Sequence, residues 1–82
     1  MKILVVDDHV LIRDALRGVL KQLRGDASIL EASDCGQTMR LIEQHPDLDL
    51  IVLDLNLPDR DGFSVLAELR ERYATTAVVV LS

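Results

Sequence analysis

Three aspartates stand where apolar runs of the chain end. Asp7 and Asp8 follow the run Ile3–Val6, and Asp54 follows the run Leu50–Leu53. Short continuous apolar runs are typical of strands buried on both faces, so each strand here delivers its acids to a loop. Carboxylates held close together repel one another unless their pKa values rise or a cation compensates. Oxygen ligands from two or three acids suit Mg²⁺, which keeps several waters and bridges to phosphoryl oxygens.

The alternative is that these acids are three separate, solvated loop residues, as most surface carboxylates are. We favour a shared site because two independent apolar runs end in acids in the same way. The question is then which elements of the chain could bring Asp7, Asp8 and Asp54 together.

A first helix is expected from His9 to Leu23, where apolar residues recur at three- and four-residue steps. Asp8 is its expected N-cap, because a carboxylate suits the positive end of a helix, and Gly25 its expected stop. Four basic residues follow the same helical spacing, and we interpret them as a solvated face: Arg13, Arg17, Lys21 and Arg24.

Strands and helices alternate over the rest of the chain. We expect an edge strand at Ser28–Ala32, helices at Cys35–His45 and Gly62–Tyr73, and a last apolar strand at Ala77–Leu81. The expected caps are Asp34, with Gln37 three residues later, for the second helix and Asp61 for the third. The expected buried stripe of the third helix is Phe63, Leu66, Leu69 and Tyr73.

This alternation predicts an α/β fold with a parallel sheet and right-handed crossovers. Ligands of such sheets bind outside the carboxyl ends of the strands, where the strand order reverses. If the first strand lies between the second and the third, then Asp7, Asp8 and Asp54 converge at that point.

Composition narrows the function classes. Eighty-two residues allow one small domain, and a net charge of −5 argues against direct nucleic-acid binding. The single Cys35 excludes an internal disulfide, and at a helix start its thiol is expected to have a lowered pKa. No apolar stretch approaches the length of a membrane span, so we expect a cytoplasmic protein.

Five landmarks, in order, resemble the receiver domain of two-component response regulators: strand-Asp7-Asp8, strand-Asp54, Leu57-Pro58, Asp61-Gly62 and strand-Ser82. The resemblance covers the whole chain. The segment from Asp7 to Leu16 looks most like regulators with a LuxR/FixJ-type output domain.

The resemblance implies a flavodoxin-like (CheY-like) parallel sheet, with strand order 2-1-3-4 and helices on both faces. In the family a fifth strand and two further helices complete the fold. On this interpretation residues 1–82 are the N-terminal portion of a receiver domain. The family's fifth-strand Lys also has no counterpart, since no Lys or Arg follows Arg72.

The resemblance also implies roles for individual residues. Asp54 would be the phosphoacceptor, supplied by a sensor histidine kinase. Asp8, Asp54 and the backbone carbonyl of Asn56 would bind Mg²⁺, and Asp7 would hold a metal-bound water. Ser82 would be the switch hydroxyl. The domain would control a transcriptional output domain outside this stretch, and would be no enzyme beyond its own phosphoryl transfer and dephosphorylation.

Two alternatives remain open. One is an unphosphorylated receiver-like dimerisation module, because Ala77–Leu81 would be an uncharged edge strand next to an uncovered sheet face, and such edges pair with other chains. The other is a haloacid-dehalogenase-like phosphohydrolase, because the segment Asp54-x-Asn56 superficially resembles the nucleophile loop of that family. That family needs a second Asp where Asn56 stands, and a longer chain.

Overall fold

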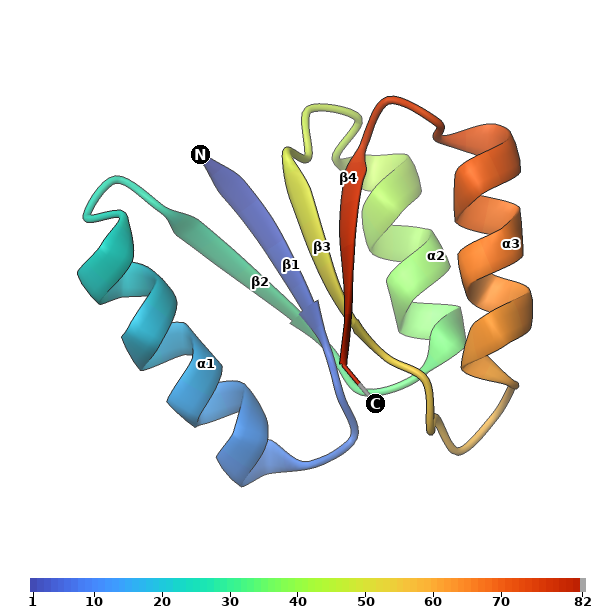
Figure 1. The fold of residues 1–82 in the computed structure, drawn as a ribbon, viewed down its shortest axis with the longest axis horizontal. Helices are drawn as coiled ribbons and strands as arrows, with labels where there is room; N and C mark the ends of the chain where they lie inside the picture. The colour runs from blue at the N-terminus through green and yellow to red at the C-terminus, as the bar shows by residue number, and fades with distance from the viewer. Residues whose placement is uncertain (82) are drawn as a thin grey trace.

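The computed structural model describes residues 1–81, and Ser82 lies outside the described residues. Its elements follow the expected alternation (Figure 1): β1 (Lys2–Val6), α1 (Val10–Leu23), β2 (Ser28–Ala32), α2 (Cys35–Gln44), β3 (Leu50–Asp54), α3 (Gly62–Arg72) and β4 (Ala77–Leu81). The bounds of β2 and β4 are as predicted, and the others differ from the prediction by one residue at one end. None of the helices within residues 1–81 is long and apolar enough to cross a membrane.

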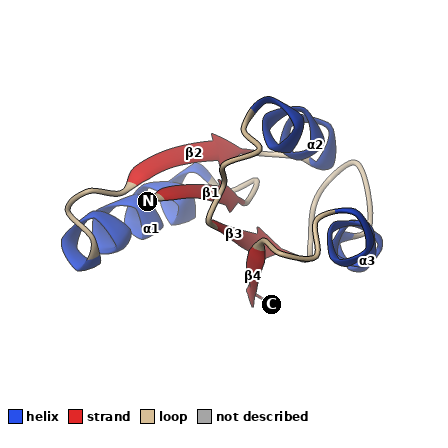
Figure 2. Cartoon of the chain, turned by 90° about the horizontal axis from the view of Figure 1, so that it is seen from above, coloured by secondary structure: helices blue, strands red, loops and turns tan. Residues whose placement is uncertain are grey.

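The four strands form one sheet in the order β2-β1-β3-β4, and all pairs are parallel. This confirms the predicted order, with β1 between β2 and β3. Helix α1 covers one side of the sheet, while α2 and α3 lie on the other (Figure 2). Within the described chain, β2 and β4 are the two edge strands.

Successive residues of the central strands point to opposite faces of the sheet, so an apolar run can serve both faces. On the side of α2 and α3 the core is the larger: Leu4, Val6, Ala32, Cys35, Ile42, Leu48, Ile51, Leu53, Val65 and Leu69. On the side of α1 the buried cluster is Ile3, Val5, Ala27 and Val52. Leu16 and Leu20 of the helix pack against this cluster but are themselves only partly buried. The hydrophobic core is thus divided unequally between the two faces.

The caps of α2 and α3 are those predicted. The Asp34 side chain accepts a hydrogen bond from the backbone N–H of Gln37, and that of Asp61 accepts one from Phe63. The Gln37 side chain reaches back as in a capping box, but it accepts from the N–H of Ser33 rather than of Asp34 itself.

Asp8 is not the N-cap of α1, which corrects the prediction. The cap position is occupied by His9, without a side-chain cap hydrogen bond, and the helix begins at Val10. The Asp8 carboxylate instead lies 3.1 Å from the His9 ring nitrogen Nδ1. This contact with the ring of the adjacent His9 therefore takes the place of the cap.

The predicted stripe of α3 is confirmed at Leu69, which is buried, and at Leu66 and Tyr73, which pack against the core, but not at Phe63. The buried residues of the helix are Gly62, Val65 and Leu69, whereas Phe63 is 64% exposed. The reason lies at Gly62, where an added Cβ would lie 2.4 Å from the Cα of Leu55. Only a residue without a side chain allows this approach, and the contact turns the next residue, Phe63, toward solvent.

We therefore expect Gly62→Ala to lower the free energy of unfolding by roughly 1–3 kcal/mol, the usual cost of overpacking. Gly18→Ala is the matched control, since a Cβ at Gly18 meets nothing within 4 Å. In that exposed helix interior the change should raise stability by about 0.5–1 kcal/mol. Urea unfolding curves of both variants would measure this, and similar effects at the two glycines would contradict the close approach.

Candidate functional site

The predicted acids converge where β1 and β3 end. Val6 pairs with Leu53 in the parallel register, so Asp7 and Asp54 follow from paired positions. Asp7, Asp8, His9 and Asp54 each place one ligand atom within 4.8 Å of the others. The three carboxylates predicted from sequence therefore share one site, and His9 joins them.

Asp54 is one of the buried members of the cluster, with only 4% of its surface exposed. Its Oδ1 accepts a hydrogen bond from the backbone N–H of Asn56 at 3.0 Å. The loop residue Asn56 is itself exposed. A carboxylate held by one backbone donor has further lone pairs, which remain available for another ligand.

Asp7 is equally buried and faces the loop that leads into α1. Its Oδ1 accepts from the backbone N–H of His9 at 2.8 Å and lies 2.7 Å from the Nδ1 of the same residue. Asp8 stands at the rim of the cluster, with its side chain 35% exposed. The cluster thus has two buried carboxylates and one that is open to solvent.

The side chain of His9 is 64% exposed, yet its ring contacts both Asp7 and Asp8. The hydrogen bond with Asp7, and then the negative charge of Asp8, raise the pKa of His9 above its ordinary 6.5. In the sequence, the position of this histidine directly after two acids indicates that it could contact them.

Arg13 of α1 contacts the backbone beside the cluster. Its Nη1 donates to the backbone carbonyl of Asp7, and its Nε donates to Glu31 of β2 at 3.1 Å. Arg17 also forms an ion pair with Glu31. The predicted solvated face is wrong for Arg13, whose side chain is 15% exposed, whereas Arg17 stays 49% exposed while it pairs with Glu31.

The loop after β3 is closed at its base by a backbone hydrogen bond from Gly62 to the carbonyl of Leu55, and by a bridge between Asn56 and Asp61. Cys35 is buried beneath this loop, with its Sγ 3.8 Å from the carbonyl of Arg60. Burial raises the pKa of the Cys35 thiol to about 11. This effect of burial outweighs the lowering of the thiol pKa that is expected at a helix N-terminus.

The donor set of the cluster fits Mg²⁺. Three carboxylates supply the hard oxygen ligands that this ion prefers, and Asn56 carries a backbone carbonyl in the adjoining loop. Uncompensated, such carboxylates repel one another, so a divalent cation is favoured between them. The predicted switch hydroxyl of Ser82 lies outside the described residues.

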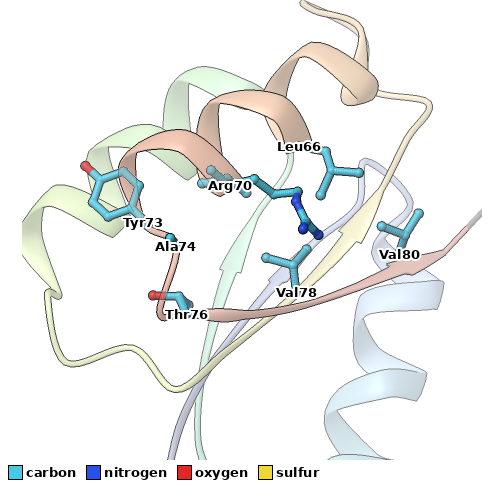
Figure 3. A pocket seen from close by; sticks show the side chains of 8 residues that line it. Leu66, Arg70, Tyr73, Ala74, Thr76, Val78 and Val80 are labelled. Atoms are coloured by element: carbon cyan, nitrogen blue, oxygen red, sulfur yellow. The ribbon is translucent and has the colours of Figure 1, made fainter.

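Two shallow hollows occur elsewhere among residues 1–81. One, of about 230 Å³, lies between α3 and β4 and is lined in part by Leu66, Arg70, Tyr73 and Val78 (Figure 3). The other, of about 260 Å³, is lined by Glu31, Gln37, Arg40, Leu41 and Gln44. None of the clustered side chains lines either hollow.

Comparison with known proteins decides the family. Residues 3–82 match the model of the response regulator receiver domain. The chain belongs to this family. It is 41% identical over 81 residues to the glycerol metabolism activator of Pseudomonas putida, and 36% identical over 80 residues to the nitrate/nitrite response regulator protein NarL of Escherichia coli. These alignments cover 99% and 98% of the chain but 37% of each relative, so the chain spans little more than a third of those proteins.

The fold of a receiver domain is also found among solved structures. A LuxR-family two-component response regulator from Aurantimonas sp. SI85-9A1 superposes with a TM-score of 0.83 at 28% identity, over 96% of this chain and 56% of that one. The relatives that match this receiver include transcription regulators of the NarL and LuxR type, which confirms the family inferred from the five landmarks.

The His9 contacts predict a pH dependence. Because its pKa is raised in the folded state, His9 contributes stability that is present below pH 6.5 and is lost as pH rises through the folded pKa. In metal-free protein, NMR titration of the His9 ring should give a pKa above 6.5. Asp7→Asn removes the largest cause and should bring the pKa back toward 6.5, whereas Asp14→Asn, on the exposed face of α1, should not. A parent pKa at or below 6.5 would contradict the contacts.

Proposed function

We propose that Asp54 accepts a phosphoryl group from the phosphohistidine of a sensor histidine kinase. A carboxylate oxygen of Asp54 attacks the phosphorus, a new O–P bond forms, and the P–N bond to the kinase imidazole breaks. The imidazole leaves with the electron pair and takes up a proton, and Asp54 becomes an acyl phosphate. The observation that carries this proposal is the convergence of Asp7, Asp8 and Asp54 within 4.8 Å at the carboxyl ends of β1 and β3.

Asp8, Asp54 and the backbone carbonyl of Asn56 would hold Mg²⁺, with Asp7 acting through a bound water. When bound, the ion supplies positive charge that offsets the charge of the transferring phosphoryl group. The protein's own contribution is position. The N–H of Asn56 holds one Asp54 oxygen, and the N–H of His9 holds one Asp7 oxygen, so both carboxylates have fixed orientations.

The partners follow from the family. A sensor histidine kinase would donate the phosphoryl group, and a transcriptional output domain outside these 82 residues would read the state of the receiver. Support comes from the matched relatives, which are a glycerol metabolism activator and a nitrate/nitrite response regulator. We place this exchange in the cytoplasm. The domain would catalyse only its own phosphoryl transfer and dephosphorylation, and we do not propose the phosphohydrolase alternative.

The first test is direct phosphorylation. The full-length gene product, incubated with Mg²⁺ and acetyl phosphate, should gain a phosphoryl-sized mass that is stable to acid and labile to base, as acyl phosphates are. Asp54→Asn should abolish this adduct. Asp47→Asn is the matched control, because Asp47 is an exposed acid that pairs with Lys2, outside the cluster. Intact-mass spectrometry measures the result, and an unmodified parent protein would refute the proposal.

A second role is favoured by the exposure of β4. Val79 and Val80 of this edge strand are 50% and 39% exposed, and no charged residue lies in Ala77–Leu81. Charges and prolines normally protect such edges from pairing with a second chain. We therefore propose that the 82-residue chain self-associates, through β4 and the uncovered sheet face beside α1.

Gel filtration over a wide concentration range tests this. We expect the 82-residue chain to elute above its monomer mass of 9.1 kDa at high concentration. Val79→Lys places a charge on the edge and should shift the equilibrium toward monomer. Thr75→Lys adds the same charge in the preceding turn and should leave elution unchanged. Elution of the parent as a monomer at all concentrations would be the contrary result.

A further inference from the structure

The loop between β3 and α3 touches a second helix at its tip. Asp59, in the middle of this loop, directs its carboxylate at the start of α2 rather than into solvent. Its Oδ1 accepts from the backbone N–H of Cys35 at 2.9 Å, and its Oδ2 accepts from that of Gly36 at 3.2 Å. The two segments are 24 residues apart in sequence, so this is a tertiary contact and not a local cap.

The first turn of α2 is thereby shared between two carboxylates. Asp34 occupies the ordinary cap position and accepts from Gln37 at 2.8 Å, which leaves the N–H groups of Cys35 and Gly36 for Asp59. The positive end of the helix favours both negative charges. These donors lower the pKa of Asp59, in agreement with a carboxylate that is held in its charged form.

The same loop carries Asn56 next to the phosphoacceptor. At its base the loop is fixed to the sheet by the hydrogen bond from Gly62 to Leu55 and by the bridge between Asn56 and Asp61. At its tip the two hydrogen bonds of Asp59 fix it to α2. The Cys35 Sγ, 3.8 Å from the carbonyl of Arg60, adds a weaker contact at the same place. Because the loop is held both at its base and at its tip, these contacts restrain the backbone at Asn56.

We propose that Asp59 is a positioning residue for the phosphoacceptor site, because its two hydrogen bonds to the start of α2 fix the loop whose Asn56 N–H holds Asp54 and whose Asn56 carbonyl would bind the ion. This inference rests on the proposed function, since it assigns Asp59 a role in holding the Mg²⁺ ligand of that site. Asp59 touches neither the ion nor the phosphoryl group. It acts through the backbone of the loop, as outer partners of metal ligands do in general.

The experiment compares Asp59→Ala and Asp59→Asn with the parent, all as full-length protein. Asp47→Ala is the control, since it removes an exposed carboxylate that pairs with Lys2. Calorimetric titration gives the Mg²⁺ affinity. Hydrogen exchange with mass spectrometry follows the peptides that cover the loop and the start of α2.

We expect Asp59→Ala to weaken Mg²⁺ binding by roughly tenfold, the lower end of the usual effect of an outer-partner mutation. The peptide that contains the N–H of Asn56 should exchange faster, while the strand β1 keeps its protection. Asp59→Asn retains one acceptor oxygen and should give an intermediate loss. Asp47→Ala should match the parent in both measurements.

Faster exchange at α2 with unchanged Mg²⁺ affinity would show a merely structural cap and would overturn the inference. Equal losses in Asp59→Ala and Asp47→Ala would do the same, because the effect would then be one of net charge. A parent that binds Mg²⁺ but forms no acyl phosphate would refute the proposed function alone. A parent that binds no Mg²⁺ would refute both.

Discussion

The parallel pairing of β1 with β3 is the constraint on which the site depends. Ladder hydrogen bonds fix the register with Val6 opposite Leu53. A shift by one residue would exchange the side chains that pack on the two faces and would move Asp7 away from Asp54. The residues that follow the pair, Asp7 and Asp54, are consequently brought together by the packing of the core, although repulsion between their charges opposes it.

The surrounding groups limit this repulsion without neutralising the site. Backbone N–H groups of His9 and Asn56 each stabilise one carboxylate, and the His9 ring lies between Asp7 and Asp8. Arg13 holds the carbonyl of Asp7, not its carboxylate, so its charge supports the backbone and leaves the acid's oxygens free. The balance retains a concentrated negative charge at the end of the sheet, which is the property that a cation-dependent phosphoacceptor needs.

Much of the fold was readable from local pattern. The apolar runs indicated the strands, and the bounds predicted for Ser28–Ala32 and Ala77–Leu81 were correct. Asp34 and Asp61 were correct as caps, since capping is a contact within a few residues. The order of the strands came from resemblance to a family and not from the residues, because periodicity says nothing of which strands pair.

One error is local, because Asp8 contacts the ring of the adjacent His9 instead of capping its helix. The other errors come from tertiary contacts: Gly62 closely approaches Leu55, and the next residue, Phe63, faces solvent. At Cys35, burial raises the pKa of the thiol by more than the helix N-terminus lowers it. Asp59 was missed for the same reason, because a loop acid that meets a helix from another part of the chain leaves no signal in its own neighbourhood.

The unequal division of the core has a dynamic consequence. In the 82-residue chain, α1 has no fully buried residue, whereas α2 and α3 each bury three. Detachment of α1 therefore exposes little buried apolar area to water. Local opening of this helix consequently costs less free energy than opening of the opposite face. The two sides of the sheet would behave as separate cooperative units. Because α1 begins directly after His9, fraying of its first turn would disturb the contacts of His9 with Asp7 and Asp8.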